Sequence, residues 1–111
     1  MVEKKILDYL NNKLDVPAKM EHGTDETGQY AVIEKTGGSR TNFIYNSIIT
    51  VQSYADSMYD AASLNEKVKD AMFAMPDEGE VVSITLNSDY NYTDTTTKKY
   101  RYQAVFNVVH Y

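Results

Sequence analysis

The stretch FIYNSIITVQSY, residues 43–54, decides how this chain folds. It is rich in β-branched and aromatic residues, which favour strands. Its apolar side chains alternate onto two faces, Phe43, Tyr45, Ile49 and Val51 on one and Ile44, Ile48 and Tyr54 on the other. Apolar residues on both faces predict a central strand covered on two sides. One cover could be helices of this chain and the other a neighbouring subunit.

One helix is predicted before this strand in the sequence, and a second helix after it. In residues 2–14, apolar side chains recur at helical spacing, and Pro17 ends the segment because the residue before a proline is disfavoured in the helical region. Asp56 or Ser57 caps the second helix, which spans residues 58–75 and stops at Pro76. The apolar stripe of this second helix consists of Ala61, Leu64, Val68, Ala71, Met72 and Met75.

Shorter strands complete the predicted fold. Residues 18–22 form a short strand and residues 30–35 a longer one, and the glycine pair in residues 36–42 indicates a hairpin loop. Residues 80–92 and 98–111 read as two further strands, paired through a short polar turn. In the first of them Val82, Ile84, Leu86, Tyr90 and Tyr92 share one face, and in the second Tyr100, Tyr102, Ala104, Phe106 and Val108 do. We therefore predict one α+β domain over residues 1–111, with two helices packed on one face of a mostly antiparallel sheet of four to five strands.

Composition narrows the class of protein. The chain has 111 residues and no cysteine, which excludes disulfides, cysteine zinc sites and thiol catalysis. The N-terminal residues carry mixed charges and no long apolar run, so we expect no signal peptide, no membrane segment and an intracellular protein. The net charge of −5 argues against specific nucleic-acid binding, because phosphate contacts require a basic face.

The charges are also unevenly distributed. Residues 56–80 hold seven acids against two lysines, whereas residues 97–111 hold three basic residues and no acid. This split could be a plain solvated surface. It would also suit head-to-tail contacts between copies, in which a negative face meets a positive one.

No motif in the sequence predicts catalysis. His22 and His110 lack metal-ligand spacing and read as surface histidines. Gly37-Gly38-Ser39 leads into a strand, unlike a phosphate-binding loop, and residues 89–93 fail the calcium-loop pattern at its sixth and twelfth positions. No nucleophile elbow is present. We expect no enzyme, no cofactor and no metal.

Tyrosine is the unusual feature of the composition, with ten copies. Tyrosine is enriched at protein interfaces, although its preference for strands alone could account for the number. Tyr90, Tyr92, Tyr100 and Tyr102 flank one turn. This hairpin is therefore predicted to be a contact surface.

Three blocks of the sequence carry a family resemblance: residues 31–42, residues 48–65, and residues 86–94 together with 99–106. They resemble small tail terminator and tail completion proteins of long-tailed bacteriophages and prophages of Gram-positive bacteria. The resemblance implies an α+β fold and a hexameric ring that caps the tail tube, ends tube polymerisation and joins the head-completion proteins. DNA would pass through the lumen. The resemblance also implies that the protein is in the host cytoplasm during assembly and then in the tail or neck of the virion.

By this resemblance, contacts with neighbouring subunits or the tube fall in two segments. Their residues are Thr36, Gly37, Gly38, Ser39 and Arg40 in the first, and Tyr90, Tyr92, Lys98, Lys99, Tyr100 and Arg101 in the second. Two alternatives stay open. One is another head–tail connector or neck protein, and the other is a small-molecule-binding α+β module, for which the sequence names no ligand.

Overall fold

The computed structural model describes residues 1–21, 28–78, 81–93 and 99–111. Its elements, in chain order, are α1 (Val2–Lys13), β1 (Ala18–Lys19), β2 (Tyr30–Thr41), β3 (Ile44–Ala55), α2 (Met58–Ala74), the 3₁₀ turn η1 (Met75–Glu78), β4 (Val81–Asn91) and β5 (Tyr100–His110).

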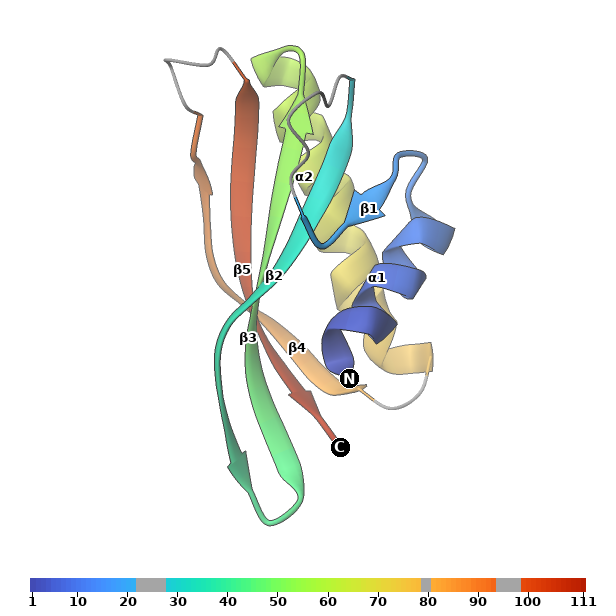
Figure 1. Ribbon diagram of the computed structural model, residues 1–111, viewed down its shortest axis with the longest axis vertical. Coiled ribbons are helices and arrows are strands. Elements are labelled where there is room, and N and C mark those ends of the chain that lie inside the picture. Colours follow the sequence, from blue (N-terminus) through green and yellow to red (C-terminus); the bar gives the residue numbers. More distant parts are fainter. Residues whose placement is uncertain (22–27, 79–80, 94–98) are drawn as a thin grey trace.

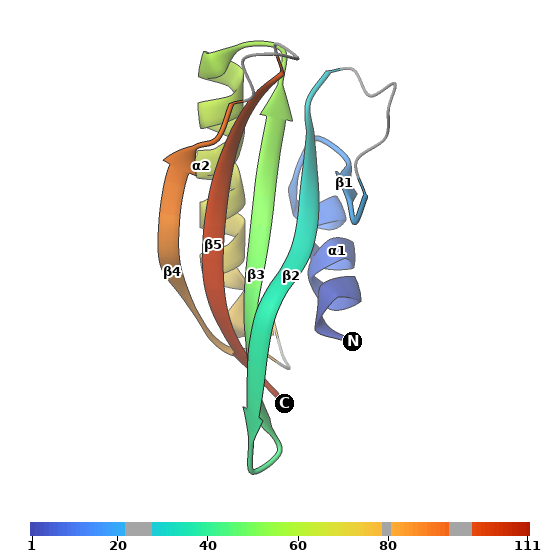
Figure 2. The ribbon, with the colours of Figure 1, turned by 60° about the vertical axis from the view of Figure 1, so that its left-hand side comes forward.

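The strands form one sheet in the order β1-β2-β3-β5-β4. β1 runs parallel to β2, and all other neighbours are antiparallel. Both α-helices lie on the same face of this sheet, α2 against β3 and β5 and α1 beside β2 (Figures 1 and 2). The predicted α+β fold, with two helices on one face of a mostly antiparallel sheet, is confirmed. β3 is the central strand, as its two apolar faces predicted.

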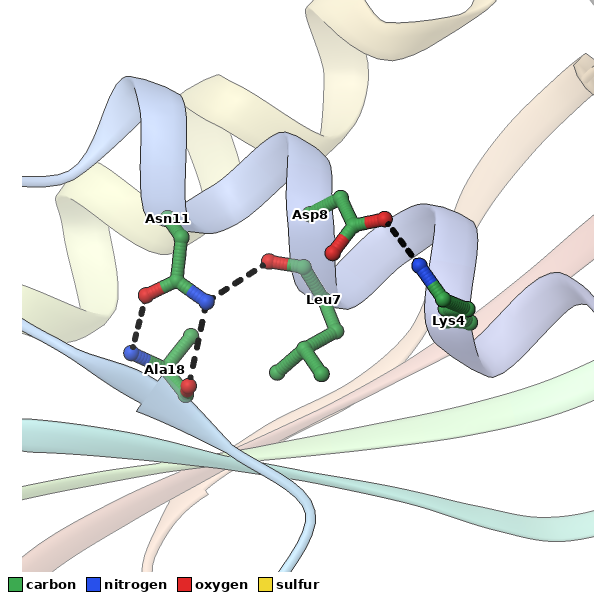
Figure 3. Close-up of polar contacts among 5 residues, drawn as sticks. All are labelled: Lys4, Leu7, Asp8, Asn11 and Ala18. Atoms are coloured by element: carbon green, nitrogen blue, oxygen red, sulfur yellow. Dashed lines mark hydrogen bonds and ion pairs between the residues drawn. The ribbon is translucent and has the colours of Figure 1, made fainter.

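α1 buries Val2, Ile6, Tyr9 and Leu10 and ends one residue earlier than predicted, because Leu14 is already extended, with φ −96° and ψ 151°. The side chain of Asn11 then connects the helix to β1 (Figure 3). Its amide Nδ2 donates to the carbonyl oxygens of Leu7 (3.1 Å) and Ala18 (3.2 Å), and its Oδ1 accepts from the Ala18 N–H (2.9 Å). Asn11 thus pairs with Ala18 as a neighbouring strand would.

α2 begins as the sequence predicts. The Asp60 N–H donates to the Ser57 Oγ at 3.1 Å, which identifies Ser57 as the N-cap. The predicted stripe faces the sheet: Ala61, Leu64, Val68, Met72 and Met75 are buried, and Ala71 is half-buried. These side chains meet Ile33, Ile49, Val51, Ala104, Phe106 and Val108 from the sheet to form the main core.

The predicted hairpin loop at residues 36–42 is wrong. β2 continues through both glycines to Thr41, with a bulge at Thr36, and the turn consists of Asn42 and Phe43 at φ 49° and 68°. A two-residue turn with two positive φ angles matches the twist of an antiparallel hairpin. A Cβ on Gly37 would lie 3.3 Å from Ile48 Cδ1, so glycine there reflects a close approach of β2 to β3.

The predicted shared face of residues 82–92 is also wrong. The register of β4 shifts between Val81 and Ser83 and again between Leu86 and Ser88. Each bulge adds a residue and so exchanges the faces that follow it. Leu86 lies opposite Phe106 of the core, whereas Tyr90 lies opposite Gln103 on the sheet face away from the helices.

Candidate functional site

The hairpin of β2 and β3 extends beyond the rest of the sheet as an arm, which we define as residues 36–46 (Figures 1 and 2). β5 ends at His110, opposite Tyr45, so the part of the arm beyond Tyr45 is only two strands wide. Every arm residue is exposed except the half-buried Gly37. The arm therefore contributes no residue to the main core, and most of its side chains are exposed to solvent.

The tip of the arm carries aromatic side chains around one cation. Phe43 is 77% exposed, and Ile44 and Tyr45 are also exposed. The Arg40 guanidinium lies 5.4 Å from the ring centroids of both Phe43 and Tyr45. Cation–π contacts of this kind hold the three side chains in one surface. An exposed cluster of large apolar groups is typical of an interaction site.

At the root of the arm, His110 is buried and partnered, so its interpretation as a surface histidine is wrong. Its Nε2 lies 2.8 Å from the Ser47 Oγ, its Nδ1 lies 3.2 Å from the Tyr111 carbonyl oxygen, and its ring stacks on Tyr45 at 5.3 Å. A serine–histidine pair at this distance resembles a nucleophile and its base. Ser47 is only 1% exposed, however, which closes it to a substrate. The pair connects β5 to β3 next to the arm. His22 lies outside the described residues.

A second surface lies on the sheet face away from the helices, which we call the open face. There Tyr30 and Tyr54 stack with ring centroids 4.7 Å apart and are 2% and 3% exposed. The Lys99 Nζ lies 3.5 Å from the Tyr30 hydroxyl. With Val32, the two tyrosines form a small apolar cluster separate from the main core. Because both rings are buried, they cannot stack on the bases of a nucleic acid.

Hydrogen bonds continue from this stack across the open face. Arg101 Nη1 donates to the Tyr54 hydroxyl (2.9 Å), which donates to Gln52 Oε1 (3.1 Å). Gln52 donates to Gln103 Oε1 (2.9 Å), and Gln103 donates to the Tyr90 hydroxyl. Each group is fixed by its neighbours, so the open face presents a rigid polar row.

The guanidinium of Arg101 also orders the outer end of this row. It lies 4.3 Å from the Tyr92 ring centroid, and its Nε donates to the Tyr92 carbonyl oxygen at 2.6 Å. Tyr90 and Tyr92 meet edge to face and are both exposed.

The predicted contact residues thus divide between two places. Thr36, Gly37, Gly38, Ser39 and Arg40 belong to the arm, and Tyr90, Tyr92, Lys99 and Arg101 belong to the open face. Tyr100 and Tyr102 lie on the helix-facing side, because they alternate with Arg101, so the four hairpin tyrosines do not form one surface. Lys98 lies outside the described residues.

The arm and the open-face row lie far apart along β3. Nine residues separate Tyr45 from Tyr54, which corresponds to about 30 Å of strand. The sequence prediction missed Phe43, Ile44 and Tyr45 as tip residues, because it placed the turn at the glycines. Asn42 was the available signal, since asparagine tolerates a positive φ.

Between α2 and β4, the carboxylate of Asp89 holds two side chains. It accepts from Asn65 Nδ2 at 2.6 Å and from Lys69 Nζ at 2.5 Å, and Lys69 also pairs with Glu66 at 2.7 Å. The hydrogen bond to Asp89, followed by that to Glu66, raises the pKa of Lys69 above its ordinary value. Asp89 therefore connects β4 to α2.

An open hollow of 370 Å³ lies between α1 and α2 and bears on the small-molecule alternative. It is lined by Tyr9, Lys13, Leu14, Asp15, Lys67, Asp70, Ala71 and Ala74. Ligand pockets are mostly apolar with a few convergent polar groups. Two lysines and two aspartates in an open lining do not fit that description.

Within the described part of the chain, no group of three or more histidine, aspartate or glutamate side chains is placed to hold a metal ion. No helix built from the described residues is long and apolar enough to cross a membrane. No protein-family model matches the chain, and no curated protein matches it.

Proposed function

We propose that this protein is a phage structural subunit that caps the tail tube as a ring, ends tube polymerisation and provides the joint to the head-completion proteins. The family resemblance of residues 31–42, 48–65, 86–94 and 99–106 names this role. The main structural support for this proposal is the arm. A projecting two-stranded hairpin with exposed Phe43, Ile44 and Tyr45 is suited to bind another protein.

The physical demands of a ring support the same proposal. Each subunit of a ring contacts its two neighbours through two different surfaces, and these surfaces must be complementary. This chain has an aromatic arm with Arg40 near its tip and an acid-rich segment at residues 56–80. Its net charge of −5 suits a channel through which DNA slides, since a basic lumen would retain the phosphates.

The test is electron microscopy of the purified protein mixed with the tail tubes of its phage. We expect one ring at one end of each tube and tubes of defined length. Decoration along the tube, or no binding, would reject the cap. A ring that binds head connectors and not tubes would assign the protein to the neck instead.

A deletion phage supplies the second readout. Loss of a cap should give tubes of variable length that do not join heads, and supplying the protein in trans should restore both properties. Normal tail length without the protein would exclude this role.

A further inference from the structure

The solvent-facing side of α2 carries a line of side chains that complements the arm. Tyr59, Glu66, Asp70 and Phe73 fall within about 40° of one line down the helix, given 3.6 residues per turn. We call them the α2 stripe. Tyr59 is 82% exposed and Phe73 is 46% exposed, and the two acids between them are exposed as well. The stripe thus has an aromatic group at each end and two carboxylates in the middle, of which Glu66 pairs with Lys69.

Phe73 is held in a fixed orientation. Its ring meets Phe106 of the core edge to face at 6.0 Å, while nearly half of its surface stays open. An aromatic side chain that is anchored on one edge and exposed on the other has lost its rotamer entropy before binding, which favours a partner. Leu86 of β4, opposite Phe106, is exposed on this side of the sheet.

The two surfaces carry charges of opposite sign. Arg40 lies between two aromatic rings and Asp70 lies on the stripe, and neither forms an ion pair with any residue that the structure describes. The arm runs away from α2 along the long axis of the molecule (Figures 1 and 2). The surface that Arg40 would meet is therefore on another copy.

The backbone at the tip gives an independent indication. Phe43 holds a φ of 68°, a conformation that disfavours side chains larger than glycine. Residues kept in such conformations cluster at binding and switch sites. The turn does not require this strain, because glycine would adopt the same conformation more easily. The strained residue places a phenyl ring in the turn at the tip of the arm.

We infer that the arm of one copy docks on the α2 stripe of a second copy, with Phe43 packed against its exposed aromatic groups and Arg40 paired with Asp70. The contact joins two different surfaces, so it propagates from copy to copy and closes into a ring when the rotation permits. This inference rests on the proposed function, because it names the subunit interface of the ring.

The chain has no cysteine, which makes disulfide crosslinking a clean test. Thr41→Cys is placed on the arm and Ala62→Cys on α2, between Tyr59 and Glu66. The two single variants are mixed and oxidised, and we expect heterodimers in at least tenfold excess over either homodimer. Asn12→Cys on α1, used in place of Ala62→Cys, is the matched control and should give no such excess.

Charge exchange then tests the named pair. Arg40→Glu should lower the heterodimer yield at least tenfold, Asp70→Arg should do the same, and both together should restore it. Lys4→Glu on α1 is the control with an equal change of charge. Circular dichroism of each variant verifies folding. A yield no higher than with Asn12→Cys, dominant arm-to-arm homodimers, or no rescue by the double exchange would overturn the inference.

The double-cysteine protein separates this inference from the proposed function. It should give a ladder of crosslinked species that ends at one closed size. If the crosslinked ladder forms but the protein does not cap tubes, the inferred interface stands and the proposed capping function is rejected. If the Arg40→Glu variant still caps tubes, the proposed capping function stands and the inferred interface is rejected.

Discussion

Truncation of Asp89 to alanine should remove the main polar connection between β4 and α2. Its carboxylate accepts hydrogen bonds from Asn65 at 2.6 Å and from Lys69 at 2.5 Å. Asn65 is 1% exposed, and its Oδ1 has no hydrogen-bond partner among the residues that the structure describes. After Asp89→Ala, its Nδ2 would be buried without the acceptor that it now has.

The magnitude follows from these contacts. A buried amide left without its partner costs about 1–3 kcal/mol. The ion pair with Lys69 is partly open to solvent and Lys69 keeps Glu66, so its loss adds only about 0.5 kcal/mol. The sum is about 1.5–3.5 kcal/mol, out of a total stability on the order of 5–15 kcal/mol. For a domain of this size, the midpoint of thermal unfolding should fall by about 6–20 °C.

Urea unfolding of four proteins measures this directly: the parent, Asp89→Ala, Asn65→Ala and the double variant. Once Asn65 is alanine, no buried amide remains to be orphaned, so Asp89→Ala should cost at least about 1 kcal/mol less in that background. Asp89→Asn retains an acceptor for Asn65 and should lose about half as much as Asp89→Ala. Strictly additive losses, or a cost for Asp89→Ala below about 0.5 kcal/mol, would refute the reasoning.

Three further predictions concern the arm and the ion pair. Phe43→Gly should raise the free energy of unfolding by about 1 kcal/mol, because it relieves a positive φ, and should lower tube capping; urea unfolding and electron microscopy check the two effects. Gly37→Val should cost about 1–2 kcal/mol through crowding against Ile48, measured as a lower urea midpoint that Ile48→Ala partly restores. The pKa of Lys69 is raised in the folded protein, so its contribution is complete below its ordinary value of 10.5 and is lost as pH rises through the folded value. The stability difference between the parent and Lys69→Met should therefore be constant from about pH 7 to 9.5 and shrink above about pH 10.5, measured by urea unfolding across that range.

The helices could be read from the sequence because their determinants are local. Ser57 caps α2 through a contact with the N–H group three residues away. The buried apolar residues from Ala61 to Met75 recur with the period of the helix. The central position of β3 was equally accessible from its apolar residues on both faces, although the helices of this chain cover only one of those faces. These features depend on near neighbours in the chain or on the pattern of one segment.

The bulges could not be read in the same way. A bulge is a single extra residue whose place is set by the partner strand, and the sequence of β4 has no glycine to mark one between Leu86 and Ser88. One such residue moved Tyr90 to the open face, where it meets Gln103 and not the core. In β2, the bulge at Thr36 allowed the strand to continue past glycines that resembled a loop. The sequence therefore indicated the β2–β3 and β4–β5 hairpins as contact segments, but it did not predict which of their side chains share a face.

The glycine pair and Phe43 together explain why the arm exists at all. Gly37 lets β2 approach Ile48 closely, so the two strands stay paired where no helix supports them. The turn is then displaced to Asn42 and Phe43, at a conformation that glycine would adopt more easily. Since the arm adds nothing to the main core, this unfavourable choice does not serve the fold of the monomer. The contact with a second copy that we infer gives a reason for keeping this side chain at a cost to its own turn.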